Sequence, residues 1–164
     1  MRVVGCVGLM ALILNTSGCA GRTPEGLGLR EGRLAPCPSS PNCVSSDATD
    51  PGHAIEAIAV EGSMTEAWAG LRSLLETTER VTIVSDEPDY LHAVFTTRIM
   101  RYRDDVEFHA RPQQGEIAVR SASRVGYSDM GTNRKRVEWI RSELVRRGLA
   151  RPGRDAPRAQ KAAR

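Results

Sequence analysis

The chain has 164 residues, with 23 Lys and Arg, 20 Asp and Glu, and a formal net charge of +3. The positive excess lies in Arg2 and in residues 151–164, which leaves residues 19–150 slightly acidic. A central segment without excess positive charge argues against nucleic acid as a partner. Once both ends are set aside, about 130 residues remain, which suits one domain better than two.

The first residues predict export. Arg2 is followed by an uncharged, largely apolar run at 3–14 and then by small and polar residues. A run of about 12 apolar residues fits the core of a secretory signal and is too short to span a bilayer as a helix. We therefore expect residues 1–18 to be a signal peptide.

The segment Thr16-Ser17-Gly18-Cys19 resembles the lipobox of bacterial lipoproteins, although Thr16 stands where Leu is usual. This resemblance implies that Cys19 is acylated and becomes the first residue of the mature chain. By the sorting rule of such lipoproteins, Ala20 after the cysteine favours the outer membrane, with the folded part facing the periplasm. The alternative is ordinary signal cleavage after Ala20, because Gly18-Cys19-Ala20 is itself small-x-small.

Two segments flank the expected domain. Residues 19–36 comprise the anchored cysteine and a spacer rich in Gly, Arg, Pro and Glu. Residues 150–164 are basic, with prolines and alanines, and cannot bury a core, so we expect a disordered, solvated tail. Residues 37–149 are then a single domain.

Cys37 and Cys43 remain free to pair once Cys6 is removed and Cys19 is acylated. They enclose the turn-forming sequence Pro-Ser-Ser-Pro-Asn, and an exported chain meets an oxidising compartment, so we predict a disulfide. A loop this short adds roughly 2 kcal/mol in the chain-entropy model. A zinc site would need two further ligands and only His53 is near, so we expect no metal and no cofactor.

The hydrophobic pattern predicts strands and two helices in chain order. A first strand at 55–60 is followed by a helix at 64–78, which opens on the capping box that begins at Ser63. Alternation of apolar residues predicts further strands at 81–85, 90–100, 106–110 and 116–125. A last helix at 133–147 ends at Gly148. The fold class is α+β, a small antiparallel sheet with two helices packed on one face.

Three segments in this order resemble the uncharacterised DUF1499 family, namely Cys37–Ser46, Asp104–Phe108 and Arg120–Arg136. The resemblance covers about residues 34–147. It implies a small exported protein, often lipoprotein-like, whose activity has not been defined.

A strand period of two places Asp105 and Glu107 on the sheet face that bears Arg120 and Arg124. One interpretation is a cross-strand ladder of salt bridges that shapes an exposed sheet surface, each pair contributing well under about 1 kcal/mol. The other is a site for an anionic or polar ligand formed by Arg120, Arg124 and Arg134, because guanidinium groups match carboxylate and phosphate.

Four further polar residues lie on the opposite side of the same strand or in the segment that follows it in the chain. Ser121 and Ser123 fall on the apolar side, where hydroxyls bonded to a neighbouring loop would explain them. Asp129 and Asn133 can satisfy free backbone N–H groups at the start of the last helix, or can form the floor of an anion pocket. The candidate ligand or partner face is Asp105, Glu107, Arg120, Ser121, Ser123, Arg124, Asp129, Asn133 and Arg134.

No catalytic residue is predicted. The chain has no nucleophile-elbow motif, and none of its three histidines has the context of a triad. Asp104 and Asp105 are adjacent on a strand and point to opposite sides, so they cannot act on one bond. We expect a non-catalytic binding or structural module of the cell envelope, held to a membrane by its N-terminal lipid. Its partner would be an unknown envelope protein or a small anionic ligand. The alternative is a hydrolase acting on an envelope polymer or a lipid headgroup.

Overall fold

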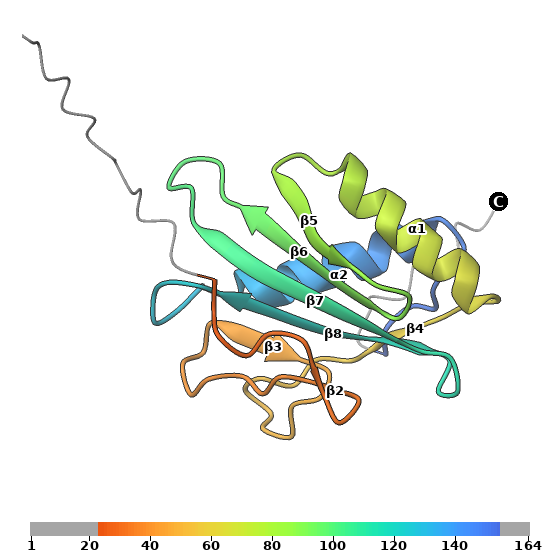
Figure 1. Ribbon diagram of the computed structural model, residues 1–164, viewed down its shortest axis with the longest axis horizontal. Helices are drawn as coiled ribbons and strands as arrows, with labels where there is room; N and C mark the ends of the chain where they lie inside the picture. The colour runs from red at the N-terminus through yellow and green to blue at the C-terminus, as the bar shows by residue number, and fades with distance from the viewer. Residues whose placement is uncertain (1–22, 155–164) are drawn as a thin grey trace, which may run out of the picture.

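The computed structural model describes residues 23–154 of the chain, shown in Figure 1. The elements follow in the order β1 (Leu29–Arg30), β2 (Arg33–Leu34), β3 (Cys43–Ser45), β4 (Ile58–Ala59), α1 (Met64–Thr77), β5 (Val81–Asp86), β6 (Tyr90–Thr96), β7 (Arg103–Arg111), β8 (Glu116–Ser123) and α2 (Thr132–Arg146). Within this part of the chain, neither helix is long and apolar enough to cross a membrane.

Six strands form one sheet in the order β3-β8-β7-β6-β5, and β4 pairs with β8 beyond the end of β3. All these pairings are antiparallel, and β1 and β2 form a separate hairpin. The predicted α+β class is confirmed, but the sheet is larger than expected. β3 was missed because three residues are too few to show an alternation of apolar and polar side chains.

Both helices begin and end close to where the sequence predicted. The Ser63 hydroxyl caps α1 by accepting a hydrogen bond from the Glu66 backbone N–H at 3.5 Å. α2 is followed by Gly148 at φ +71°, the left-handed conformation that glycine adopts without strain after a helix end.

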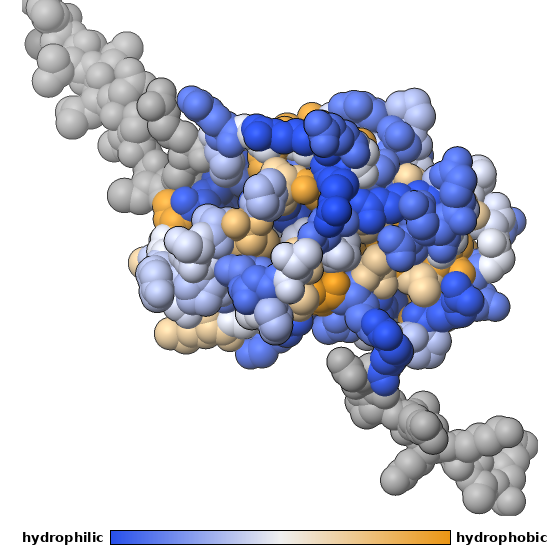
Figure 2. All heavy atoms as spheres, turned by 90° about the horizontal axis from the view of Figure 1, so that it is seen from below, coloured by the Kyte–Doolittle hydropathy of each residue, from blue (hydrophilic) through white to orange (hydrophobic). Residues whose placement is uncertain are grey.

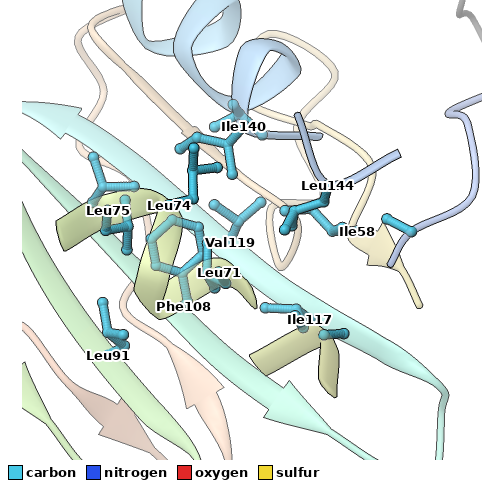
Figure 3. Packing of buried hydrophobic residues seen from close by; sticks show 14 of the residues in the cluster. Ile58, Leu71, Leu74, Leu75, Leu91, Phe108, Ile117, Val119, Ile140 and Leu144 are labelled. Carbon is cyan, nitrogen blue, oxygen red and sulfur yellow. The ribbon is translucent and has the colours of Figure 1, made fainter. Parts of the chain in front are cut away.

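The helices cover one face of the sheet and bury its apolar side chains between the two layers (Figure 3). Phe108 on β7 and Val119 on β8 are fully buried, and they meet Leu71 of α1 and Ile140 of α2 within one cluster. The sheet and both helices contribute side chains to this core. Its burial is therefore the main favourable contribution to folding.

The other face of the sheet is covered as well. Residues 24–36, which we call the N-terminal arm, carry the β1–β2 hairpin and lie over this face. Leu34 of the arm packs with Tyr90 and Ala118 in a second small cluster. The predicted spacer is therefore, over these residues, part of the folded structure. Its Gly-rich composition suggested a linker, but two of its three leucines, Leu29 and Leu34, find apolar partners on β6 and β8.

Strand β6 is shorter than predicted. It ends at Thr96, and the following loop projects Ile99 and Met100 into solvent, with 85% and 63% of their surface exposed. The alternation of residues 90–100 continues past the last strand pairing, between Thr96 and Arg103, so pattern alone could not locate the end.

The chain is also held at its other end. Ala150 is buried and bridges to Val60, and the Arg151 backbone N–H donates to the Ala59 carbonyl at 2.8 Å. The first residues of the predicted tail are thus hydrogen-bonded to β4 and packed beside it. The predictions for the signal peptide, for Cys19 and for the tail beyond residue 154 fall outside the described residues.

Phe108→Ala should lower the free energy of unfolding by about 3–5 kcal/mol, because it leaves a cavity where both helices meet the sheet. Denaturant unfolding would measure the change. Val84→Ala, at a β5 side chain that is 57% exposed, is the matched control and should change stability by less than about 0.5 kcal/mol. A similar small loss in both variants would contradict this account of the core.

Candidate functional site

The buried face under the arm centres on the carboxylate of Glu107, which has no exposed surface. Its Oε1 accepts hydrogen bonds from the Gly28 backbone N–H at 2.7 Å and from the Tyr90 hydroxyl at 2.8 Å. Its Oε2 accepts from Nη1 of Arg120 at 2.9 Å. Burial and the neighbouring Glu107 raise the pKa of Tyr90, so this hydroxyl stays protonated and remains a donor. One carboxylate thus joins the arm to β6 and β8.

Asp105, two residues earlier on β7, is the second buried carboxylate. It binds the Arg124 guanidinium through two hydrogen bonds of 2.8 and 2.9 Å and His92 Nε2 at 2.8 Å. Burial alone would raise the pKa of Asp105, but the hydrogen bonds from His92 and Arg124 lower it below the ordinary value. Asp105 is therefore a charged anchor within the sheet.

The cross-strand ladder forms, but its predicted exposure is wrong. Glu107 lies directly opposite Arg120 in the β7–β8 register, and each predicted guanidinium pairs with a carboxylate of β7. However, Asp105 and Glu107 are fully buried and the Arg120 side chain is only 8% exposed. Both pairs are therefore buried ion pairs and not surface ones.

A second polar network lies on the helix side of the sheet and centres on Asn133, the second residue of α2. Its carbonyl oxygen accepts from the Ser121 hydroxyl at 2.6 Å. Its amide donates to Ser123 Oγ and to the Asn42 backbone carbonyl, both at 2.9 Å. Ser121 and Ser123 thus tie β8 to the start of α2 and to the segment before β3.

Asp129 caps α2 from the loop before it. Its carboxylate accepts from the backbone N–H groups of Gly131 and Asn133, at 2.9 and 2.7 Å. Burial acts to raise the pKa of Asp129, but these hydrogen bonds lower it. Arg134, the remaining member of the candidate face, donates to the Gly52 carbonyl at 3.4 Å and makes no hydrogen bond to another candidate residue in the described chain. Eight of the nine candidate residues therefore divide between two networks, Arg134 belongs to neither, and the nine do not form one face.

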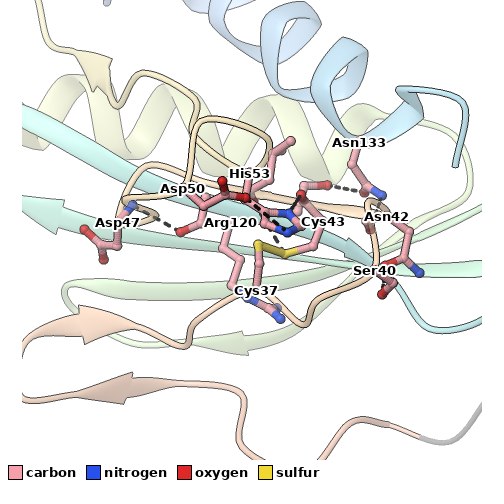
Figure 4. The surroundings of a disulfide bond; sticks show 12 residues. Cys37, Ser40, Asn42, Cys43, Asp47, Asp50, His53, Arg120 and Asn133 are labelled. Atoms are coloured by element: carbon pink, nitrogen blue, oxygen red, sulfur yellow. Dashed lines mark hydrogen bonds and ion pairs between the residues drawn. A yellow bond between two sulfur atoms is a disulfide. The ribbon is translucent and has the colours of Figure 1, made fainter. Parts of the chain in front are cut away.

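The predicted disulfide is present between Cys37 and Cys43, with their Cα atoms 5.7 Å apart (Figure 4). Cys43 lies on β3 opposite Ala122 of β8, so the bond joins the end of the arm to the sheet. His53, weighed as a zinc ligand, instead contacts the Cys43 carbonyl through Nδ1 at 2.9 Å. Over residues 23–154 no group of His, Cys, Asp and Glu is placed to hold a metal ion.

The histidines do not form a nucleophile–base pair. In the described chain, none of His53, His92 and His109 hydrogen-bonds to a Ser or Thr hydroxyl. Burial, followed by the nearby Arg111 guanidinium, lowers the pKa of His109 and favours its neutral form.

The structure contains a cleft that the sequence did not reveal. It has a volume of about 440 Å³ and lies between the end of α1, the end of β6 and the first turns of α2. Phe95 and Trp139 supply its aromatic surface, and its cationic side chains are Arg80, Arg98, Lys135 and Arg136. These residues come from three distant segments, so only the spacing of Lys135 and Trp139 on one helix face could have suggested it.

The four cationic side chains of the cleft differ in whether they form an ion pair. The Arg136 guanidinium pairs with Asp104 and lies 5.0 Å from the centre of the Phe95 ring. Arg80 pairs with Glu79. Arg98 and Lys135 form no ion pair with any residue that the structure describes. The cleft therefore presents two free cations beside a half-exposed indole, which suits an anion that carries an apolar group.

Arg120→Met should lower the free energy of unfolding by about 3–5 kcal/mol, because it leaves the buried Glu107 charge without its cation. Adding Glu107→Gln should restore part of the loss, since the amide oxygen can still accept from Tyr90 and Gly28. Denaturant unfolding of both variants tests this coupling.

Arg72→Met is the control, because it removes the exposed Arg72–Asp86 pair, with side chains 33% and 39% exposed, and should cost less than about 1 kcal/mol. If Arg120→Met were as mild as this control, the buried pair would not hold the arm.

Comparison with known proteins gives one family. No match was found among curated proteins or among solved structures. The family model described as "Protein of unknown function (DUF1499)" matches residues 33–144, from β2 to the last turn of α2. It thus spans the disulfide, the whole lining of the cleft, and both buried networks except Gly28. The chain belongs to the DUF1499 family.

Proposed function

We propose that this protein is an exported cell-envelope lipoprotein whose domain binds a small anionic amphiphile, without catalysis, in the cleft between α1, β6 and α2. The observation that carries the proposal is the pairing of two free cations, Arg98 and Lys135, with the aromatic surface of Phe95 and Trp139. A headgroup carrying phosphate or carboxylate would bind the cations, and its apolar portion would lie against the rings.

The buried networks support this choice of site by elimination. Arg120 and Arg124, the first candidates for anion binding, already bind Glu107 and Asp105 under the arm. Their side chains are only 8% and 5% exposed, so they offer little surface to a ligand. Arg98, Lys135 and Trp139 are exposed, so a ligand reaches them without any rearrangement.

A binding role also agrees better with the cleft than hydrolysis does. The lining includes Thr78, Thr96, Thr97 and Thr132 but no histidine, and its single carboxylate is that of Glu79. A threonine nucleophile needs a neighbouring base, which these residues do not supply.

Trp139 provides a direct test of the cleft. Titration with dodecyl phosphate, kept below its micelle concentration, should change Trp139 fluorescence until the site saturates. The double variant Arg98→Glu with Lys135→Glu should weaken binding about tenfold or more, since it removes both free cations.

Two controls make this test specific. Trp139→Phe should abolish the signal, because the remaining tryptophan, Trp68, is buried. Arg151→Glu makes the charge change of one of these two substitutions at a side chain that is 58% exposed and outside the cleft, and it should leave affinity unchanged. Absence of saturation, or equal weakening by Arg151→Glu, would argue against the cleft as a site.

The anchor has its own test. Growth of producing bacteria with an alkyne analogue of palmitate should label the protein, and Cys19→Ala should abolish the label while Cys6→Ala keeps it. Acylation of Cys19 is expected because the preceding segment resembles a lipobox. A Cys19→Ala chain that is still labelled, or a wild-type chain that never is, would contradict the proposed lipid anchor.

A further inference from the structure

We propose that the end of the domain formed by the β6–β7 loop (residues 97–102) and the β8–α2 loop (residues 124–131) docks on an anionic lipid bilayer. This inference goes beyond ligand binding in the cleft. The proposed anchoring at Cys19 determines which end of the domain would face the membrane. The side chains of the two loops provide the groups that would bind lipid.

The two loops concentrate the exposed apolar side chains of the described chain. Six of its eight large exposed hydrophobic residues lie on them. Met130 is 88% exposed, Ile99 85% and Tyr127 77%. Apolar and aromatic side chains at the tips of loops are unfavourable in water, and they suit the boundary between headgroups and acyl chains.

Cations accompany these side chains. Arg98 and Arg101 belong to the first loop, Arg103 follows it at the start of β7, and no acidic residue occurs in residues 97–103. The three guanidinium groups form no ion pair with other described residues. Asp129 is the acidic residue of the second loop, and its carboxylate faces the first turn of α2. Exposed arginines beside apolar tips match an anionic surface.

The loops lie side by side at one end of the sheet. The Arg124 backbone N–H donates to the Arg103 carbonyl at 3.1 Å, which joins the end of one loop to the beginning of the other. Both loops project at the left end of Figure 1. In Figure 2, turned about the horizontal axis, apolar surface is again visible at the left end of a mostly hydrophilic face.

The described chain begins at this same end. The red segment that begins the described chain lies at the left in Figure 1, and Pro24 and Gly26 line a hollow with Arg120, three positions before β8 ends. The four residue-to-residue steps from Cys19 to Thr23 span at most about 14 Å. A lipid on Cys19 would therefore hold this end of the domain against the bilayer and leave little freedom for any other end to face it.

The test asks which end of the domain faces lipid. Full-length chain purified in detergent is reconstituted into vesicles of phosphatidylethanolamine and phosphatidylglycerol whose acyl chains are brominated. Trp139→Phe removes the exposed native indole, and Ile99→Trp or Met130→Trp then places a probe on each loop. Gln113→Trp is the matched control, in the β7–β8 turn at the other end of a strand about 30 Å long.

Each loop probe should lose roughly half of its fluorescence or more, because interfacial side chains lie about 5–10 Å deep, and Gln113→Trp should lose almost none. Adding Arg101→Glu with Arg103→Glu should reduce quenching of the Ile99→Trp probe.

Equal quenching at both ends, or co-flotation without quenching, would contradict the docking surface while leaving the anchor intact. Failure to co-float with vesicles would contradict both. A shift of the loop-probe emission that needs no vesicles and grows with protein concentration would indicate a second copy on this end, and would also overturn the proposal.

Discussion

The buried carboxylate of Glu107 is the constraint on which this structure depends. A charge with no exposed surface near the middle of a sheet is costly unless all its acceptor positions are used. Arg120 supplies the opposite charge, Tyr90 a hydroxyl and Gly28 a backbone donor. The last of these belongs to the arm, so satisfying the charge requires the arm to be in place. The disulfide at Cys37 fastens the arm's end to the sheet through Cys43.

The two sides of β8 are therefore specialised in different ways. Toward the helices, Val119 joins the apolar core, and Ser121 and Ser123 bind Asn133 at the start of α2. Toward the arm, Arg120 and Arg124 neutralise the carboxylates of β7. Most polar side chains of this segment are thus bound within the protein, although Arg120 Nε has no hydrogen-bond partner among the described residues. The residues that look most chemical in the sequence therefore serve the architecture.

Local patterns predicted much of this. Period two in residues 104–109 correctly separated Phe108 from Glu107, and it placed the carboxylates and guanidinium groups on one face; the structure adds that Arg120 lies opposite Glu107. The spacing of Cys37 and Cys43 predicted the disulfide, and Ser63 and Gly148 marked helix ends. The arm escaped prediction because its short strands show no period, and its decisive contact is a backbone N–H of Gly28, which any residue but proline carries. The cleft escaped because its lining comes from around residues 78–80, 95–98 and 132–139, which no local pattern connects.

The arm also determines when the fold can be completed. Gly28 must find Glu107, 79 positions later in the chain, and β3 must find β8, which is made last among the strands. Contacts so distant in sequence form slowly, because closing long loops costs entropy before any pairing is gained. The first residues to be synthesised thus stay without partners until almost the whole chain exists. If the chain is exported as we propose, this delay would keep it unfolded while it passes through a translocation channel, and the arm would close only on the far side.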